Sequence, residues 1–247
     1  MRKTHTLPNL LREMRDLGIA HAALLPIELP FISRNAETYL ELSRDRPEIV
    51  CFGSVHPYEW KPLARLEHQK RLGARGVKIH PAVQLIYPGD RRAMAVYGTC
   101  GQLGLPVLWH CGPVGIEPEL GRRRSQVRLY ERPIAEHPST TFILGHAGAL
   151  QPEVALDLAS RYENVWLEVA SQSLTVFRKL VERGPRDRIM MGSDGPFYHQ
   201  ATALAKVLIA TESDEAARRG VLYNNAARLF GLPPRAVSGR EATRRAG

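Results

Sequence analysis

The sequence contains few cysteines and no CxxC pair. Its 247 residues include three, Cys51, Cys100 and Cys111, which lie far apart in the chain. An odd number of widely spaced cysteines excludes both a disulfide framework and a zinc site made of thiolates. We expect reduced thiols whose main role is packing.

Long hydrophobic runs are missing as well. No apolar stretch approaches the ~18 residues that span a bilayer. The first residues, MRKTHTLPNLLREMRDLG, lack the continuous apolar core of a signal peptide. These absences predict a cytoplasmic protein that has no membrane partner.

Acidic residues are outnumbered by basic ones. The chain has 34 lysines and arginines against 25 aspartates and glutamates, which gives a net charge of +9. Such an excess can attract anionic substrates or nucleic acid. Much of it is clustered in residues 122–128 and in a tail that contains Arg235, Arg240, Arg244 and Arg245. No aromatic side chains are interleaved with these clusters, so we favour a small anionic substrate over nucleic acid as the partner.

Short apolar runs alternate with amphipathic stretches along the chain. The first stretch is helical, because leucines and Met14 recur at helical spacing from Leu7 to Leu17, and Gly18 supplies a stop. Seven apolar runs are predicted to be strands, at residues 19–27, 49–55, 76–80, 107–110, 141–146, 164–169 and 188–191. Further helices are predicted at residues 35–44, 63–72, 91–103, 127–136, 153–161, 174–183, 201–211 and 214–229.

This alternation predicts an α/β protein with a parallel sheet. Several of the strands are continuous apolar runs, which is typical of strands that are buried on both faces by a ring of helices. The pattern therefore favours a TIM-like (β/α)₈ barrel. No linker divides the chain before Leu232, so we expect one barrel domain over residues 1–232 and a polar, basic tail over residues 233–247.

The predicted barrel lacks its first strand. A (β/α)₈ barrel has eight units, each a strand followed by a helix. Here seven strands follow a leading helix, so the chain fits eight units only if the strand before that helix is missing. Such a barrel leaves unpaired edges on the strands at residues 19–27 and 188–191, and proteins normally avoid exposed edges. We therefore expect that a strand upstream of Met1 has been lost, or that something else fills the gap.

Polar side chains stand at the carboxyl ends of the predicted strands, which form the catalytic mouth of a (β/α)₈ barrel. A single histidine in such a position would favour a structural role. Four histidines and an aspartate at the ends of five strands favour a shared site instead. The polar residues at these ends are His56, Lys78, His80, His110, His146 and Asp194.

Imidazole nitrogens and carboxylate oxygens suit Zn²⁺ and similar divalent ions. A catalytic metal lowers the pKa of its bound water and polarises a carbonyl, and a nearby His or Asp then moves the proton. We therefore predict a divalent metal as the cofactor, with Zn²⁺ as the first choice and Mn²⁺ as the alternative. This chemistry needs no other cofactor.

Eight short segments of the sequence, in this order along the chain, resemble the amidohydrolase-2 branch of the amidohydrolase superfamily. They are LLREMRDLGI, FGSVHP, GVKIHP followed by Gln84, LPVLWHCG, FILGHAG, NVWLEVAS, RIMMGSDGPF and LYNNAARLFGL. The resemblance covers residues 7–232. It implies a (β/α)₈ barrel of metal-dependent hydrolases that has decarboxylases, lactonases and hydratases among its members.

By this resemblance His110 corresponds to a metal ligand. His146 corresponds to a second ligand or to the general acid/base, and Asp194 to the residue that binds metal and shuttles a proton. The family's His-x-His on the first strand has no counterpart, because His5 has Lys3 and Leu7 two residues away on either side. We therefore expect the chain as it stands to bind metal poorly or differently.

Lys78, His80 and Arg124 are the predicted substrate-binding residues. Lys78 faces the same side of its strand as His80, and its charge needs a partner inside the barrel. Glu168 is one candidate partner, and the alternatives are a substrate carboxylate or a metal-bridging carbamate on the lysine. Arg124 lies either in a solvated loop or in a loop that covers the mouth and holds a carboxylate by bidentate contacts.

The resulting functional hypothesis is a metal-dependent hydrolase or decarboxylase that acts on a small carboxylated substrate. A metal-activated water would work with His146 and Asp194 as an acid–base pair. One alternative is a truncated or degenerate barrel that binds a ligand or partner without catalysis, and a third interpretation is a nuclease-like barrel. The sequence leaves open the substrate, the choice between hydrolysis and decarboxylation, and the oligomeric state, a homodimer included.

Overall fold

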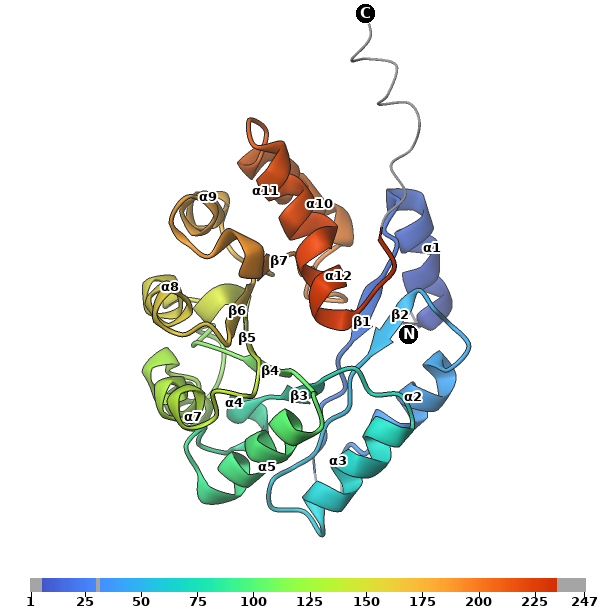
Figure 1. The fold of residues 1–247 in the computed structure, drawn as a ribbon, viewed down its shortest axis with the longest axis vertical. Coiled ribbons are helices and arrows are strands. Elements are labelled where there is room, and N and C mark those ends of the chain that lie inside the picture. Colours follow the sequence, from blue (N-terminus) through green and yellow to red (C-terminus); the bar gives the residue numbers. More distant parts are fainter. Residues whose placement is uncertain (1–5, 30–31, 235–247) are drawn as a thin grey trace, which may run out of the picture.

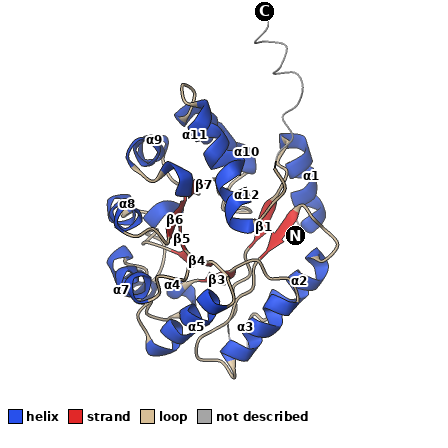
Figure 2. Ribbon diagram, viewed as in Figure 1, coloured by secondary structure: helices blue, strands red, loops and turns tan. Residues whose placement is uncertain are grey.

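The computed structural model describes residues 6–29 and 32–234, in which parallel strands form a ring with helices on its outside (Figures 1 and 2). The predicted barrel is thus confirmed, although most strands are shorter than predicted. Because residues 1–5 and 235–247 lie outside the described ranges, so do His5 and the arginines of the tail. The strands described are β1 (Ala22–Leu24), β2 (Ile49–Cys51), β3 (Val77–Ile79), β4 (Val107–His110), β5 (Phe142–Gly145), β6 (Val165–Glu168) and β7 (Ile189–Met190).

Backbone hydrogen bonds connect neighbouring strands from β1 to β7. β1 pairs with β2, and β3 to β7 pair in sequence order. The two sheets meet at Gly53, whose N–H donates to Gly76 O at 2.8 Å and whose carbonyl accepts from the Lys78 N–H at 2.8 Å. Since all pairs are parallel, the carboxyl ends of the strands lie at one end of the ring.

Helices follow the strands in the order expected of a barrel. They are α1 (Leu7–Leu17), α2 (Ala36–Ser43), α3 (Pro62–Arg71), α4 (Pro81–Gln84), α5 (Arg91–Gln102), α6 (Glu119–Arg124), α7 (Glu131–Glu136), α8 (Pro152–Arg161), α9 (Leu174–Arg183), α10 (Gln200–Ala210), α11 (Glu215–Arg219) and α12 (Asn225–Phe230). The first helix has its predicted bounds, because the Thr6 side chain caps its start and Gly18 ends it at a φ of 65°. Among these helices none combines the length and the hydropathy that a membrane span requires.

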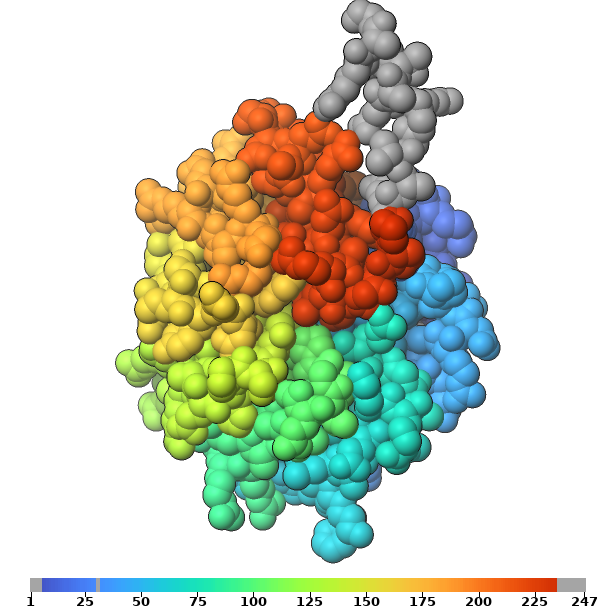
Figure 3. All heavy atoms as spheres, viewed as in Figure 1, coloured from blue at the N-terminus to red at the C-terminus, as the bar shows by residue number. Residues whose placement is uncertain are grey.

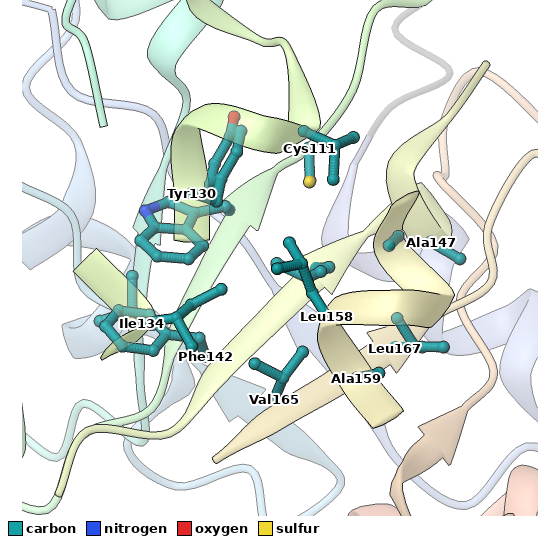
Figure 4. Packing of buried hydrophobic residues seen from close by; sticks show 14 of the residues in the cluster. Cys111, Tyr130, Ile134, Phe142, Ala147, Leu158, Ala159, Val165 and Leu167 are labelled. Carbon is teal, nitrogen blue, oxygen red and sulfur yellow. The ribbon is translucent and has the colours of Figure 1, made fainter. Parts of the chain in front are cut away.

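The main hydrophobic core lies between the strands and the surrounding helices (Figure 4). Trp109 stacks on Phe142 with ring centroids 4.3 Å apart, and Tyr130 contacts Trp109 edge-on at 4.7 Å. Trp109 and Cys111 are both buried in this core, as predicted from their positions on either side of His110. His110 therefore points away from the helices, into the ring.

A second buried cluster lies inside the ring. It combines side chains of β2, β4, β5, β6 and β7 and of the residue after β2 with one side chain from the last helix, Phe230 of α12. In the space-filling view, the C-terminal segment (red) lies against the green and cyan segments across the centre of the face shown (Figure 3). The helix thus covers one end of the strands.

The ring of strands is open between β1 and β7, as the sequence predicts. In the described ranges β1 pairs with β2 alone and β7 with β6 alone. The outer layer nevertheless continues across the opening, because α1 contacts α10 and Glu13 Oε1 accepts a hydrogen bond from the Gln200 N–H at 2.7 Å. The gap is therefore covered from outside by helices.

The free edge of β7 is partly occupied by the C-terminal helices. The helix predicted over residues 214–229 is confirmed as one continuous helical segment, which contains the π-helical turn Gly220–Asn224 between α11 and α12. This turn aims the Val221 carbonyl at the strand, where it accepts a hydrogen bond from the Met191 N–H at 3.0 Å. The Asn225 side-chain amide adds a donor to Ile189 O at 2.7 Å. The Met191 N–H and the Ile189 carbonyl therefore have hydrogen-bond partners, although no strand pairs with this edge of β7 among the described residues.

A buried ion-pair cluster holds the loop after β1 against α2 and α3. The Arg65 guanidinium donates to Glu28 Oε2 at 3.0 Å, to Glu59 Oε2 at 3.0 Å and to Glu37 Oε1 at 2.6 Å. Glu28 is 0% exposed. Burial alone would raise the pKa of Glu37, but hydrogen bonds from Arg65 and Gln69 lower that pKa to about 2. One cation thus pairs with three carboxylates.

We expect Arg65→Met to lower the free energy of unfolding by about 3–5 kcal/mol, because it leaves buried carboxylates without their cation. Urea denaturation measures this loss, and Arg71→Met, an exposed arginine of the same helix, is the matched control. The folded pKa of Glu37, about 2, lies below its ordinary 4.5, so its contribution is complete above pH 4.5 and declines toward pH 2. This dependence of stability on acid should be weaker in Arg65→Met. If Arg65→Met and Arg71→Met lowered the free energy of unfolding equally, the account of the ion-pair cluster would be wrong.

Candidate functional site

A cavity of about 1940 Å³ runs from the carboxyl end of the ring along the opening between β1 and β7 to Phe230 of α12. Most of its lining is apolar. Its titratable lining residues include six that the sequence places on strands or at their carboxyl ends: Lys78, His80, His110, His146, Glu168 and Asp194. The structure therefore brings the predicted strand-end histidines and Asp194 to one cavity, with the exception of His56.

Three imidazoles form a continuous group in this cavity. The rings of His80 and His110 stack with centroids 3.9 Å apart and an interplanar angle of 10°. His110 Nδ1 lies 3.1 Å from His146 Nε2, at hydrogen-bonding distance. This hydrogen bond needs one ring to donate and the other to accept, so the tautomers of the two histidines are linked.

Burial keeps two of these rings neutral. Loss of solvation, reinforced by the charge of Lys78 and by His146, lowers the pKa of His80 to about 3. Burial and the neighbouring His80 also lower the pKa of His110. At neutral pH each ring therefore carries one N–H and one nitrogen lone pair. In His80 the lone pair lies on Nδ1, which accepts a hydrogen bond from the Val83 N–H at 3.3 Å.

Glu168 connects the ends of two neighbouring strands. Its Oε2 accepts a hydrogen bond from the His146 N–H at 3.1 Å, and its Oε1 accepts one from the Ala170 N–H at 2.6 Å. The direct ion pair with Lys78, which was one of the alternatives that the sequence left open, is absent, since the Lys78 ammonium makes no hydrogen bond or ion pair among the described residues. The carboxylate is instead occupied by backbone donors, and it attracts Lys78 from a longer distance.

Lys78 is only 6% exposed. Burial lowers its pKa to about 8, against the opposing attraction of Glu168, Asp194 and Cys111. Lys78 lines the cavity together with His80, in agreement with the prediction that both face the same side of their strand.

Several residues of the cavity lining have positive φ values, and three of them are polar residues that follow strands. His146, Ser171 and Asp194 have φ values of 57°, 64° and 55°. Such conformations are uncommon for residues with a side chain and are found at functional sites. Hydrogen bonds involve all three residues, because the Gln172 amide donates to His146 O at 2.5 Å and the Ser171 hydroxyl donates to Asp194 Oδ2 at 3.3 Å. The strand ends are thus shaped to present His146 and Asp194.

Gly192 allows the Glu168 carboxylate to occupy its place. A Cβ atom at position 192 would lie 1.6 Å from Glu168 Oε1. We therefore expect Gly192→Ala to displace this carboxylate and to lower the free energy of unfolding by about 1–3 kcal/mol. Gly89→Ala is the control, because its added methyl group meets nothing closer than 3.8 Å. Thermal unfolding compares the two, and equal melting temperatures would show that Glu168 can move without cost.

Two residues at or near the mouth lie outside this cavity. Arg124 belongs to α6, so its cluster is helical rather than a loop; the guanidinium lies 4.7 Å from the Tyr87 ring and donates to Leu120 O at 2.6 Å. The structure does not place Arg124 among the cavity-lining residues. His56 Nε2 lies 2.9 Å from Gln84 O, which is the structural hydrogen-bonding role that its strand-end position suggests.

Sequence reasoning missed Ser171, Gln172 and Tyr130. Ser171 follows the strand NVWLEVA, so its strand-end position was a usable signal. The Tyr130 hydroxyl donates to His110 O at 2.7 Å, and Gln172 holds the His146 carbonyl. These two contacts join distant parts of the chain and leave no local pattern.

The cavity contains ligand types that suit a divalent metal, but no assembled ligand set. Imidazole and carboxylate groups are available, and His146 Nδ1 is a buried atom without a hydrogen-bond partner. In the described ranges, however, no three His, Cys, Asp or Glu side chains are grouped so that they could hold an ion. A catalytic zinc site uses three protein ligands. The described residues alone therefore do not fit a resident metal.

Comparison with known proteins identifies relatives of the whole barrel. The profile of a family described as Amidohydrolase matches residues 10–232. No curated protein matches the sequence.

Several solved structures share the fold. An uncharacterized TIM-barrel protein from Bordetella bronchiseptica is 19% identical, with 92% of this chain and 83% of that chain covered and a TM-score of 0.77. A 2,6-dihydroxybenzoate decarboxylase from Rhizobium is 20% identical, with 92% and 88% covered and a TM-score of 0.73. A dihydroxybenzoic acid decarboxylase from a Polaromonas species, solved with manganese and 2-nitroresorcinol, is 16% identical, with 93% and 87% covered and a TM-score of 0.72. At such low identity the likeness shows the fold alone.

Proposed function

Because this chain belongs to the amidohydrolase family, we propose that it is a cytoplasmic enzyme of the metal-dependent hydrolase or decarboxylase type, with a small carboxylated molecule as substrate. The solved relatives include decarboxylases, one of them with bound manganese. The observation that carries the proposal is the convergence of three adjoining imidazoles and Asp194 on one cavity at the carboxyl ends of the strands.

Both reactions of this type need groups that move a proton. Decarboxylation leaves a carbanion that must be protonated, and hydrolysis requires a water to lose a proton. We assign this role to His146 and Asp194. The hydrogen bond between His146 and His110 gives the proton a path between two rings, and Ser171 holds the Asp194 carboxylate in place.

The substrate carboxylate is assigned to Lys78. Its ammonium lines the same cavity and has no hydrogen-bonding or ion-pairing side chain among the described residues, so a ligand carboxylate can pair with it. His80 lies beside it on the same face of β3 and completes the polar part of the binding site. Arg124 is not included, because it does not line the cavity.

The metal requires ligands in addition to those described. Zn²⁺ and Mn²⁺ are both compatible with imidazole and carboxylate donors. We propose that His110, His146 and Asp194 contribute to this site once a His-x-His strand occupies the opening between β1 and β7.

The test is an assay of CO₂ release from 2,6-dihydroxybenzoate and other aromatic carboxylates, and of lactone hydrolysis. It uses the chain extended by a His-x-His strand, with Zn²⁺ or Mn²⁺ added. Turnover that disappears in His146→Gln supports the proposal. A folded, metal-loaded extended chain that turns over none of these carboxylates or lactones would refute it.

A ligand-binding barrel without catalysis is the second candidate function. It is favoured by one observation, the lack of an assembled metal-ligand set in the described ranges. Calorimetric titration with the same carboxylates separates the two functions, because this alternative expects binding without turnover in the extended chain as well.

A further inference from the structure

We propose that the Lys78 amine condenses with the carbonyl group of an aldehyde or ketone held in the cavity and forms an imine with it. This chemistry goes beyond the proposed hydrolysis or decarboxylation, and it needs no metal. The ligand class is a small carbonyl compound with an apolar body, because most of the cavity lining is apolar.

The position of Lys78 supports this chemistry. Val77 and Ile79, its neighbours on β3, are buried in the core toward the helices, so the Lys78 side chain points into the ring. There it lines the cavity, and no described residue hydrogen-bonds to its ammonium or pairs with it within ion-pair distance. A nucleophilic amine is thus presented to a large cavity without a competing contact.

The other described lysines are placed differently. Lys61 lies over the Trp60 ring, Lys179 pairs with Glu153, and Lys206 donates to Gln172 O. Lys70 is exposed on α3. None of them is among the residues that line the large cavity.

Charged and titratable groups around Lys78 affect its protonation. Glu168, Asp194 and Cys111 favour the ammonium form, while burial disfavours it and lowers the pKa of Lys78 to about 8. At pH 7 this leaves about 10% of the side chain as free amine, against about 0.03% for an ordinary lysine. Desolvated lysines of this kind are used as nucleophiles in carbonyl chemistry.

The condensation balances with groups that line the cavity. The amine lone pair attacks the carbonyl carbon, a C–N bond forms as the π bond of the carbonyl breaks, and one of the two amine protons is transferred to the oxygen to give a neutral carbinolamine. The remaining N–H proton and the hydroxyl group then leave as water, and the C=N bond forms. His146 and Asp194 line the same cavity and can accept and return the protons.

Reductive trapping tests the proposal. The full chain is incubated at pH 7 with benzaldehyde and sodium cyanoborohydride, which reduces an imine to a stable benzylamine, and peptide mass spectrometry locates the label. We expect Lys78 to be labelled at least about tenfold faster than Lys70. In guanidinium chloride Lys78 and Lys70 should be labelled at the same rate, because unfolding restores the ordinary pKa and exposure of every lysine.

Variants provide a second measurement. Lys78→Met should remove the fast label, whereas Lys70→Met, the matched exposed control, should leave it unchanged. Labelling of Lys78 in the folded wild-type chain at the rate of Lys70 or below would overturn the proposal, whether or not the Lys78→Met variant folds. The readout involves no turnover of carboxylates or lactones, so the result is independent of the proposed function.

Discussion

Asp194→Asn is expected to lower kcat by about 10²–10⁴-fold in a chain that carries a complete metal site, because proton transfer by a positioned carboxylate contributes this much. Asparagine matches the shape of the side chain and can still accept the hydrogen bond from Ser171. It also tolerates the left-handed backbone at this position, where φ is 55°. The substitution therefore removes the basic oxygen and leaves the fold unchanged.

His56→Asn is the control for this prediction. His56 also follows a strand, but it binds the Gln84 carbonyl and does not line the cavity. Its replacement should lower the melting temperature slightly and change kcat by less than about threefold, since the reacting groups remain in place. Steady-state kinetics measure kcat for the two variants. Near-normal turnover in Asp194→Asn would show that another residue transfers the proton.

Adding a strand with a His-x-His motif ahead of residue 6 is expected to raise both metal content and stability. The strand would fill the opening between β1 and β7, where neither strand has a second strand partner in the described ranges and which the cavity reaches. Burial of its apolar side chains and pairing of the two edges should contribute about 2 kcal/mol or more, which corresponds to about 4–8 °C in Tm for a chain of this size. Its two imidazoles would join His110, His146 and Asp194 as ligands.

Elemental analysis and thermal melting of the two chains measure these effects. We expect well below one metal ion per chain without the strand and about one with it. A strand in which both histidines are alanine is the control, and it should raise Tm without raising metal content. One tightly held zinc in the chain without the strand would contradict this account.

Local patterns in the sequence were sufficient for much of the fold. Helix α1 has its predicted bounds, since the Thr6 cap and Gly18 act within a few residues of the helix ends. The barrel followed from the order of apolar runs, and the open edge followed from counting them. The π-helical turn Gly220–Asn224 was not predictable, because it depends on a hydrogen bond from the Met191 N–H to a carbonyl on a distant segment.

The composition of the candidate site was determined by the sequence, whereas its connections were determined by the tertiary structure. Residues at the carboxyl ends of parallel strands must meet at one end of a barrel, so His80, His110, His146 and Asp194 could be named in advance. The hydrogen bond between His110 and His146, the free ammonium of Lys78 and the absence of an assembled ligand set among the described residues depend on distances between strands. Those distances are set by side chains from elements far apart in the chain, and no local pattern records them.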